Sequence, residues 1–231
     1  MGESPQRPRA VVAIAGTGTE VGKTWVSAAV LRGLAERGLT VCARKPAQSF
    51  DPADASSGVP TDADVLAAAT GEAIEAVCPR NRYYPVAMAP PMAADALDLP
   101  PVRLEQLVGE TRTSWPDRQV DLALVETAGG VRSPIAHDGD CARFVSELEV
   151  DEVVLVADAG LGTISAVRSA IDSLESEDVA DGDITPYLNR WDESDELHRR
   201  NRAWLEELTG RPVLTSVDDL TRRLGGLADL P

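Results

Sequence analysis

Two lysines are the first candidates for chemistry in this chain of 231 residues. Lysine and arginine together number 22, but only Lys23 and Lys45 are lysines, and every other residue in that count is an arginine. The lysine ammonium is a compact point charge that suits phosphate and carboxylate ligands. Because the chain otherwise avoids lysine, we expect both lysines to lie in a functional site.

Lys23 stands in a glycine-rich segment, Gly-Thr-Gly-Thr-Glu-Val-Gly-Lys-Thr over residues 16–24. In a phosphate-binding loop, glycines let backbone N–H groups converge on phosphate oxygens, the lysine neutralises the terminal phosphates and the final threonine reaches Mg²⁺. The usual spacing would place the first glycine at position 17, where this chain has Thr17, so the loop is one residue longer. A simple glycine turn is the alternative. The pattern favours a nucleoside triphosphate site.

Charged residues also follow other predicted strands. Lys45 follows an apolar segment at residues 39–43, Glu126 follows residues 121–125, and Asp158 follows residues 153–157. Open parallel sheets bind ligands at the carboxyl ends of their strands, so these side chains are expected near the loop. An unpaired buried carboxylate is costly, so Glu126 needs a lysine or a metal ion nearby, or else a salt bridge at the strand end.

Asp62 has two interpretations of equal weight from its position alone. It could cap the helix that begins near residue 63, or it could be a metal ligand, and Asp64 competes with it for either role.

The elements that must hold these residues alternate between apolar strands and amphipathic helices. This alternation predicts an α/β fold with a doubly wound, mostly parallel sheet and helices on both faces. Residues 50–60 are expected to form a mobile loop, and residues 78–101 an irregular segment with one short helix. Pro186 lowers the expectation of a strand at residues 184–189, because proline has no backbone N–H to donate to a neighbouring strand. In the helix predicted at residues 195–208, Trp204 and Leu205 are expected on the inner face. The predicted strands are residues 10–15, 39–43, 121–125, 153–157, 184–189 and 213–217, and the predicted helices are residues 23–37, 63–70, 104–114, 165–174 and 195–208.

Composition limits the function further. The 38 acidic and 22 basic residues give a net charge of −16, which disfavours nucleic acid or an anionic membrane as a partner. Cys42, Cys78 and Cys141 are too few and too far apart for a disulfide framework or a zinc site, so we expect reduced core thiols. No signal segment or long apolar stretch is present, which predicts a cytoplasmic protein. We expect a single ATP-binding domain over residues 1–231, with residues 1–9 as a flexible lead-in.

Several motifs occur together, in order, between residue 11 and about residue 220. They are the long phosphate loop at residues 16–24, Lys45-Pro46 with Ser49, Asp62, Met88-Ala89-Pro90, Val125-Glu126 with Ala128-Gly129-Gly130, Leu161-Gly162-Thr163-Ile164 and Leu188-Asn189-Arg190. This combination resembles the dethiobiotin synthetase family, whose phosphate loop has the same long form. Partition ATPases of the MinD type are also similar, but they place a lysine early in the loop, where this chain has none.

The resemblance implies a P-loop NTPase-like fold and a homodimer with its active site near the dimer interface. The implied reaction uses ATP and Mg²⁺ to carboxylate 7,8-diaminopelargonate (7,8-diaminononanoate) with CO₂ or bicarbonate, which closes a ureido ring and yields dethiobiotin, ADP and phosphate in biotin biosynthesis.

The resemblance also implies a role for individual residues. Lys45 would stabilise a substrate carbamate, Lys23 the transferring phosphoryl group, and Thr19 would bind substrate or phosphate. Ser49 would orient the diamine beside Ala89 and Pro90. Asn189 would bond the adenine edge. Mg²⁺ would be held by Thr24, Asp62 and Glu126. The implied nucleotide contacts are Gly18, Thr19, Glu20, Val21, Gly22, Lys23, Thr24, Trp25, Glu126, Gly129, Asn189 and Arg190.

The chain departs from the family pattern at three places. Thr127 stands where glycine is usual, Ser165-Ala166 replaces an Asn-His pair that helps bind the substrate carboxylate across the dimer, and residues 215–220 lack the proline usually beside the adenine. Two other functions therefore stay open. One is a different ATP-dependent ligase, such as an amidoligase, and the other is a MinD/ParA-like switch ATPase that binds a protein partner.

Overall fold

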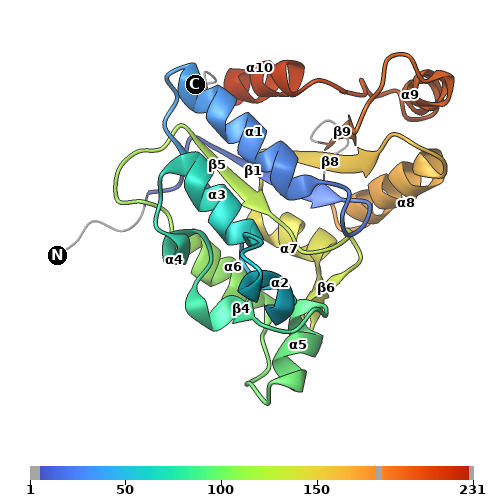
Figure 1. Cartoon of the computed structure of the whole chain (residues 1–231). Coiled ribbons are helices and arrows are strands. Elements are labelled where there is room, and N and C mark those ends of the chain that lie inside the picture. Colours follow the sequence, from blue (N-terminus) through green and yellow to red (C-terminus); the bar gives the residue numbers. More distant parts are fainter. Residues whose placement is uncertain (1–5, 180–183, 229–231) are drawn as a thin grey trace.

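A five-stranded parallel sheet in the order β2-β5-β1-β8-β9 forms the centre of the molecule (Figure 1). The computed structural model describes residues 6–179 and 184–228. The strands are β1 (Ala10–Gly16), β2 (Val41–Arg44), β5 (Leu122–Glu126), β8 (Glu152–Asp158) and β9 (Ile184–Asn189). After β1 the chain forms β2 and β5 on one side of it and then β8 and β9 on the other side. The direction in which strands are added therefore reverses at β1, beside the loop that follows this strand. The predicted doubly wound sheet is confirmed.

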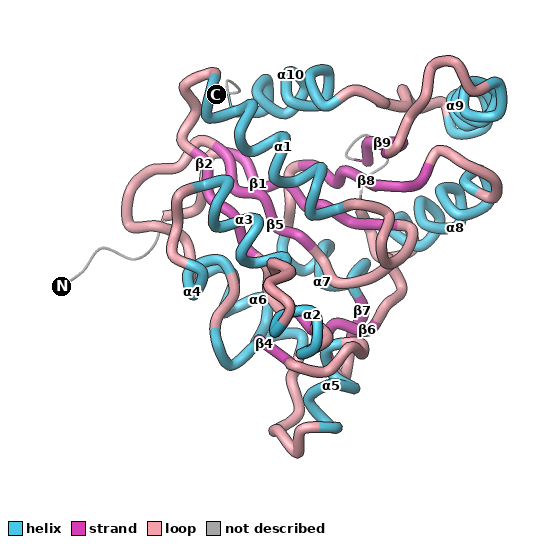
Figure 2. The backbone as a smooth tube through the Cα atoms, in the orientation of Figure 1, coloured by secondary structure: helices cyan, strands magenta, loops and turns pink. Residues whose placement is uncertain are grey.

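Helices cover both faces of this sheet (Figure 2). The side chains of β1 point alternately to the two faces. Val12 and Ile14 pack against one group of helices, the first group, and Val11 and Ala13 pack against a second group on the other face. The first group is α1 (Lys23–Glu36), α3 (Asp62–Thr70) and α10 (Val217–Ala228), and the second is α6 (Leu104–Thr113), α7 (Cys141–Leu148) and α8 (Thr163–Glu175), with α9 (Glu196–Thr209) beside α8. A strand that is apolar on both faces therefore has a helix layer on each side.

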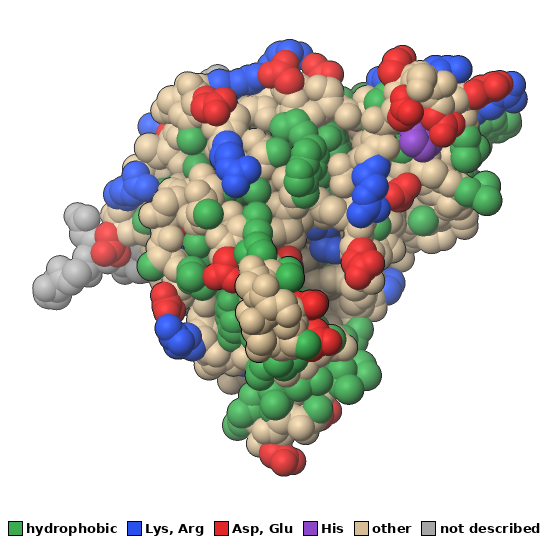
Figure 3. Space-filling model, in the orientation of Figure 1, with side chains coloured by type: hydrophobic (Ala, Val, Ile, Leu, Met, Phe, Trp, Pro, Cys, Tyr) green, Lys and Arg blue, Asp and Glu red, His purple; other side chains and the backbone are tan. Residues whose placement is uncertain are grey.

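Short elements build the end of the molecule nearest α5. They are β3 (Gln48–Ser49) paired with β4 (Tyr83–Tyr84), β6 (Pro134–Ala136) paired with β7 (Gly139–Asp140), the helices α2 (Pro52–Ser56), α4 (Ile74–Val77) and α5 (Pro90–Ala96), and a 3₁₀ turn, Arg80–Arg82. Figure 3 shows apolar side chains gathered over this end.

Three local predictions need correction or refinement. Residues 213–217 do not form a strand: Leu214 makes an isolated bridge to Tyr187, and α10 begins at Val217. Residues 50–60 contain α2, because the Asp51 carboxylate caps its first turn and Pro52 starts it. Trp204 is 53% exposed, whereas its neighbour Leu205 is buried as expected.

The strand at residues 184–189 forms despite Pro186. The Pro186 carbonyl accepts from the backbone N–H of Leu214, on the side of β9 that faces away from β8. Since the N and C=O of one strand residue point to the same side, the missing N–H also falls on that outer side. No ladder hydrogen bond to β8 is lost.

The described residues bear on three further expectations. Cys42, Cys78 and Cys141 are buried and free, and burial raises their thiol pKa values to about 12, 12 and 11. Of the predicted lead-in, residues 1–5 lie outside the described residues, and the Arg7 guanidinium donates to the Asp151 carboxylate at 3.0 Å. Every helix of the described chain is too short or too polar to span a bilayer.

Candidate active site

The loop between β1 and α1 has the backbone conformation that its glycines predict. Gly22 has φ +92°, a left-handed value that an L side chain rarely adopts, and it forms the N-terminal cap of α1. A Cβ atom at Gly22 would lie 2.1 Å from the amide nitrogen of Asn189, which itself donates to the Val21 carbonyl at 3.0 Å. The Asn189 side chain at the end of β9 therefore holds the loop in place, and only glycine fits beneath it.

Lys23 begins α1 and reaches back over this loop. Its ammonium donates to the Gly18 carbonyl at 2.9 Å, and the side chain is largely buried. Burial and, after it, the neighbouring charge of Lys45 lower the pKa of Lys23. The ammonium is therefore poorly compensated, which favours an anionic ligand within the loop.

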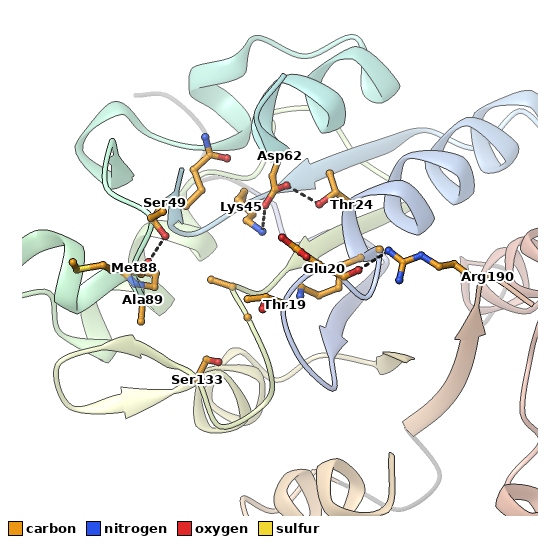
Figure 4. Close-up of a pocket in the computed structure, with 17 residues that line it drawn as sticks. Thr19, Glu20, Thr24, Lys45, Ser49, Asp62, Met88, Ala89, Ser133 and Arg190 are labelled. Carbon is orange, nitrogen blue, oxygen red and sulfur yellow. Dashed lines mark hydrogen bonds and ion pairs between the residues drawn. The ribbon is translucent and has the colours of Figure 1, made fainter. Parts of the chain in front are cut away.

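Lys45, immediately after β2, lies between the carboxylates of Asp62 and Glu126, and Figure 4 shows its contact with Asp62. Its ammonium is 2.7 Å from Asp62 Oδ2, 2.8 Å from Glu126 Oε1 and 3.2 Å from the Thr127 carbonyl. Burial alone would lower the pKa of Lys45, but the charges of Asp62 and Glu126 outweigh it and raise the pKa above its ordinary value. The same ion pair lowers the pKa of Asp62. Glu126 is fully buried at the end of β5, so the predicted need for a lysine beside it is met.

Three oxygen-bearing side chains meet at one point beside Lys45. The Thr24 hydroxyl lies 2.8 Å from Asp62 Oδ1 and 2.8 Å from Glu126 Oε1, and the Ser27 hydroxyl donates to Glu126 Oε2 at 2.7 Å. Hydroxyl and carboxylate oxygens are the hard ligands that Mg²⁺ prefers, so this donor set fits the ion. No group of three or more His, Cys, Asp or Glu side chains in the described chain is placed so that it could hold a metal ion by itself. The set thus resembles a metal site that phosphate oxygens and water would complete.

The cap of α3 rules out one of the two interpretations of Asp62, that of the capping residue. Thr61 is the capping residue, and its hydroxyl and backbone N–H exchange hydrogen bonds with Asp64 in a capping box. Asp62, the first residue of the helix, is not needed as a cap. Its carboxylate instead points toward Thr24 and Lys45 (Figure 4).

These groups open into a cavity of about 830 Å³. Twelve of the residues predicted for nucleotide, substrate or metal lie in its wall: Thr19, Glu20, Gly22, Lys23, Thr24, Lys45, Ser49, Asp62, Ala89, Pro90, Gly129 and Arg190. Five others do not line it: Gly18, Val21, Trp25, Glu126 and Asn189. Glu126 and Asn189 lie behind the wall and support it, whereas the Trp25 side chain is 60% exposed in the first turn of α1.

Five residues of the wall were missed from the sequence: Gln48, Ala87, Met88, Ala128 and Ser133. Two of the five carried a signal in the sequence, because the motifs Met88-Ala89-Pro90 and Ala128-Gly129-Gly130 contain Met88 and Ala128. Ser49 donates from its hydroxyl to the Met88 carbonyl, which joins two sides of this wall (Figure 4).

The three departures from the family pattern lie in different surroundings, and the third, residues 215–220, leads into the first turn of α10. Thr127 is buried, and its hydroxyl donates to the Ile14 carbonyl at 3.3 Å, so its side chain has room. Ser165 lies in the first turn of α8, which follows Leu161, a residue 93% exposed.

Arg190 lies on the outer side of the phosphate loop. Its guanidinium donates to the Asp158 carboxylate at 2.8 Å and to the Glu20 carbonyl at 2.7 Å.

Comparison with known proteins agrees with this geometry. A family model described as "AAA domain" matches residues 10–222. The ATP-dependent dethiobiotin synthetase BioD of Haloferax mediterranei is 36% identical over 204 residues, which cover 88% of this chain and 82% of that protein. The protein of the same name from Caulobacter sp. strain K31 is 33% identical over 94% of this chain and 91% of its own length.

Solved structures support the fold at low sequence identity. The signal recognition particle receptor FtsY from Elizabethkingia anophelis superposes with a TM-score of 0.53 at 13% identity, covering 97% of this chain and 68% of that one. This likeness concerns the arrangement of strands and helices alone. From the family model and the curated relatives, the chain belongs to the ATP-dependent dethiobiotin synthetase family of P-loop proteins.

Proposed function

We propose that this protein is an ATP- and Mg²⁺-dependent dethiobiotin synthetase, a ligase of biotin biosynthesis. Its substrates would be 7,8-diaminopelargonate, CO₂ or bicarbonate, and ATP. The observation that carries the proposal is the meeting of both lysines with Thr24, Asp62 and Glu126 at one cavity. A nucleotide site alone needs only Lys23, and the family resemblance gives the second lysine, Lys45, a role at the substrate carbamate.

The phosphate loop would hold the ATP phosphates by backbone N–H groups, with Lys23 and Thr19 as side-chain donors. Thr24, Asp62 and Glu126 would hold Mg²⁺, which neutralises charge on the phosphates when bound. Asn189 would bond the adenine edge and Arg190 would hold the nucleotide from the loop's outer side. These groups position charges and do no covalent chemistry themselves.

Lys45 would act on the second ligand. One substrate amine and CO₂ form a carbamate with loss of a proton, and a carbamate oxygen attacks the γ-phosphorus, releasing ADP and leaving a carbamic-phosphoric anhydride. The second amine then attacks the carbamate carbon, which closes the ring and expels phosphate. The Lys45 ammonium would stabilise the carbamate anion, and Ser49, Ala89 and Pro90 would orient the diamine.

Other parts of the proposal rest on the family resemblance. The protein would be a homodimer with its active sites near the dimer interface, a single ATP-binding domain, and cytoplasmic. The interface is proposed near the start of α8, because Ser165-Ala166 occupies the position of the pair that acts across the dimer in the family, and Leu161 just before α8 is almost completely exposed.

Ser165-Ala166 favours one alternative, a different ATP-dependent ligase on the same fold. These residues replace the pair that helps bind the substrate carboxylate in the family. An amine or carboxylate of another shape would then be the substrate.

One assay separates the two functions. Purified protein is incubated with Mg-ATP, bicarbonate and the diamine, each component being omitted in turn, and phosphate and dethiobiotin are measured. Phosphate release that requires both diamine and bicarbonate supports the proposal. No response to the diamine, with turnover on another amine, supports the alternative ligase.

A further inference from the structure

Gln48 lies in the wall of the cavity between two residues to which the proposed function gives roles. It stands three residues after Lys45 and directly before Ser49, in the short strand β3. Only 2% of its surface is exposed. A buried amide beside a site is costly unless both of its ends are hydrogen-bonded.

One end of this amide is bonded to the helix that carries Asp62. Gln48 Oε1 accepts from the backbone N–H of Ala63 at 2.9 Å. The first N–H groups of a helix have no partner within the helix, and Ala63 is the second residue of α3. Gln48 therefore fixes the first turn of α3 at the residue that follows Asp62, across a gap of 15 positions in the sequence.

The other end has no partner. Because a backbone N–H can only donate, the amide atom facing Ala63 must be the oxygen, which leaves the NH₂ group at the opposite end. Gln48 Nε2 is buried and makes no hydrogen bond in the described structure. A buried donor without a partner is unfavourable, so an acceptor oxygen that reached Nε2 would be stabilised there.

We propose that Gln48 serves the reaction with both ends of its amide. Through Oε1 it is a positioning residue, which holds the start of α3 so that the Asp62 carboxylate stays beside Thr24 and Lys45. Through Nε2 it donates a hydrogen bond to an oxygen of the substrate carbamate. This inference rests on the proposed function for the identity of the ligand, but its positioning part concerns only residues of the chain.

The carbamate is the ligand that fits this donor. Lys45 and Ser49, on the same segment, also line the cavity, whereas the phosphate loop lies on other elements of the wall. A carbamate offers acceptor oxygens and negative charge, and a charge-assisted hydrogen bond is stronger than a neutral one.

Two variants separate the two ends. Gln48→Met removes the acceptor and the donor, whereas Gln48→Glu keeps an oxygen for Ala63 but replaces the donor by a second oxygen. Gln106→Met is the matched control, because Gln106 Oε1 also accepts a backbone N–H at a helix start, from Arg103 at 3.0 Å, but outside the cavity. Binding of Mn²⁺ in the presence of a non-hydrolysable ATP analogue is measured by electron paramagnetic resonance, and the KM for the diamine by product formation.

Gln48→Met is expected to weaken Mn²⁺ binding by about tenfold or more, as for other residues that orient metal ligands. Gln48→Glu is expected to bind Mn²⁺ at least as tightly as the wild type but to raise the KM for the diamine by about tenfold. Gln106→Met should change neither. In an Asp62→Asn background, Gln48→Met should cause no further loss of Mn²⁺ binding, because it acts through Asp62.

Each part of the proposal can fail separately. The positioning role would be overturned if Gln48→Met bound Mn²⁺ as tightly as the wild type. It would also be overturned if Gln48→Met weakened Mn²⁺ binding as much in the Asp62→Asn background as in the wild type. A wild-type KM in Gln48→Glu would overturn the donor role. If the wild-type protein makes no dethiobiotin, the proposed function fails, while the Mn²⁺ measurements still decide the positioning role.

Discussion

At the scale of single residues, the site depends on charges that have little access to water. Lys45 is 2% exposed and Glu126 fully buried, so each stabilises the other where an unpaired charge would be strongly unfavourable. The Thr24 hydroxyl and Asp62 complete the group from α1 and α3. Four elements therefore contribute one side chain each to a group only a few ångströms across.

Replacing Lys45 by Gln should reduce dethiobiotin formation by about 10²–10³-fold, because a preorganised positive charge on a developing anion is lost. ATP binding, measured by calorimetric titration, should stay nearly unchanged. Lys23→Gln is the comparison, and it should weaken ATP binding. A Lys45→Gln variant with undiminished turnover would favour a switch ATPase over the ligase.

Replacing Gly22 by Ala should weaken ATP binding by more than about tenfold, since the new methyl group meets the Asn189 amide and the left-handed backbone is unfavourable for alanine. The control is Gly109→Ala in α6, where a Cβ would meet nothing within 4 Å, and ATP binding should be retained. Equal ATP affinity in Gly22→Ala and wild type would contradict the proposed fit between the loop and β9.

At the scale of elements, side-chain hydrogen bonds stabilise the segments that lead from a helix into the next strand. Asp121, just before β5, accepts from the Thr40 backbone N–H at 2.8 Å and from the Thr40 hydroxyl at 2.6 Å. These two bonds lower the pKa of Asp121 below its usual value of 3.8. The bonds join the amino ends of β2 and β5, whereas the cavity lies at the carboxyl ends of the strands.

This shift predicts a pH dependence of stability. A carboxyl whose pKa is lower in the folded state stabilises the fold above its unfolded pKa, and this stabilisation is lost as pH falls through the folded value. Asp121→Asn should therefore lower the free energy of unfolding by about 1 kcal/mol at pH 7, and the difference should shrink below about pH 4. Urea unfolding across pH measures it, with the exposed Asp117→Asn as control. A difference that is constant with pH would contradict the assignment.

Much of the fold could be predicted because the central strands are apolar on both faces and the phosphate loop marks one strand-to-helix junction. Residues 213–217 could not be predicted, since the apolar Val213 and Leu214 pack on the sheet edge without forming a ladder. The α7 helix is absent from the predicted helices; it begins at Cys141, and the Asp140 carboxylate caps it by accepting from the backbone N–H of Arg143.

Site residues were predictable where a family motif marked them. Gln48 was missed because its partner, Ala63, is distant in sequence and offers only a backbone N–H, which no side-chain pattern reveals. The role of Asp62 could not be settled by position alone, because capping by Thr61 depends on backbone geometry.

At the scale of the whole molecule, a net charge of −16 surrounds a cavity that holds two lysines. The overall charge disfavours polyanions, whereas Lys23, whose ammonium has only the Gly18 carbonyl as its hydrogen-bond partner among the described residues, favours a small anionic ligand in the phosphate loop. The arrangement suits a reaction in which nucleotide and carbamate meet away from bulk water.

The proposed homodimer gives a further prediction. Light scattering after size-exclusion chromatography should report twice the chain mass of 24.5 kDa. Leu161→Glu should shift the protein toward the monomer, since it places a charge at the proposed interface. Leu208→Glu, at the far end of α9, is the control and should stay dimeric. A monomeric wild-type protein that is fully active would contradict the proposed dimer.

The most direct test of the account is the formation of dethiobiotin from 7,8-diaminopelargonate, bicarbonate and Mg-ATP by the purified protein. The account predicts dethiobiotin, ADP and phosphate in equal amounts, with no product when any one substrate is omitted. Phosphate release at the same rate without the diamine, and no dethiobiotin, would contradict it.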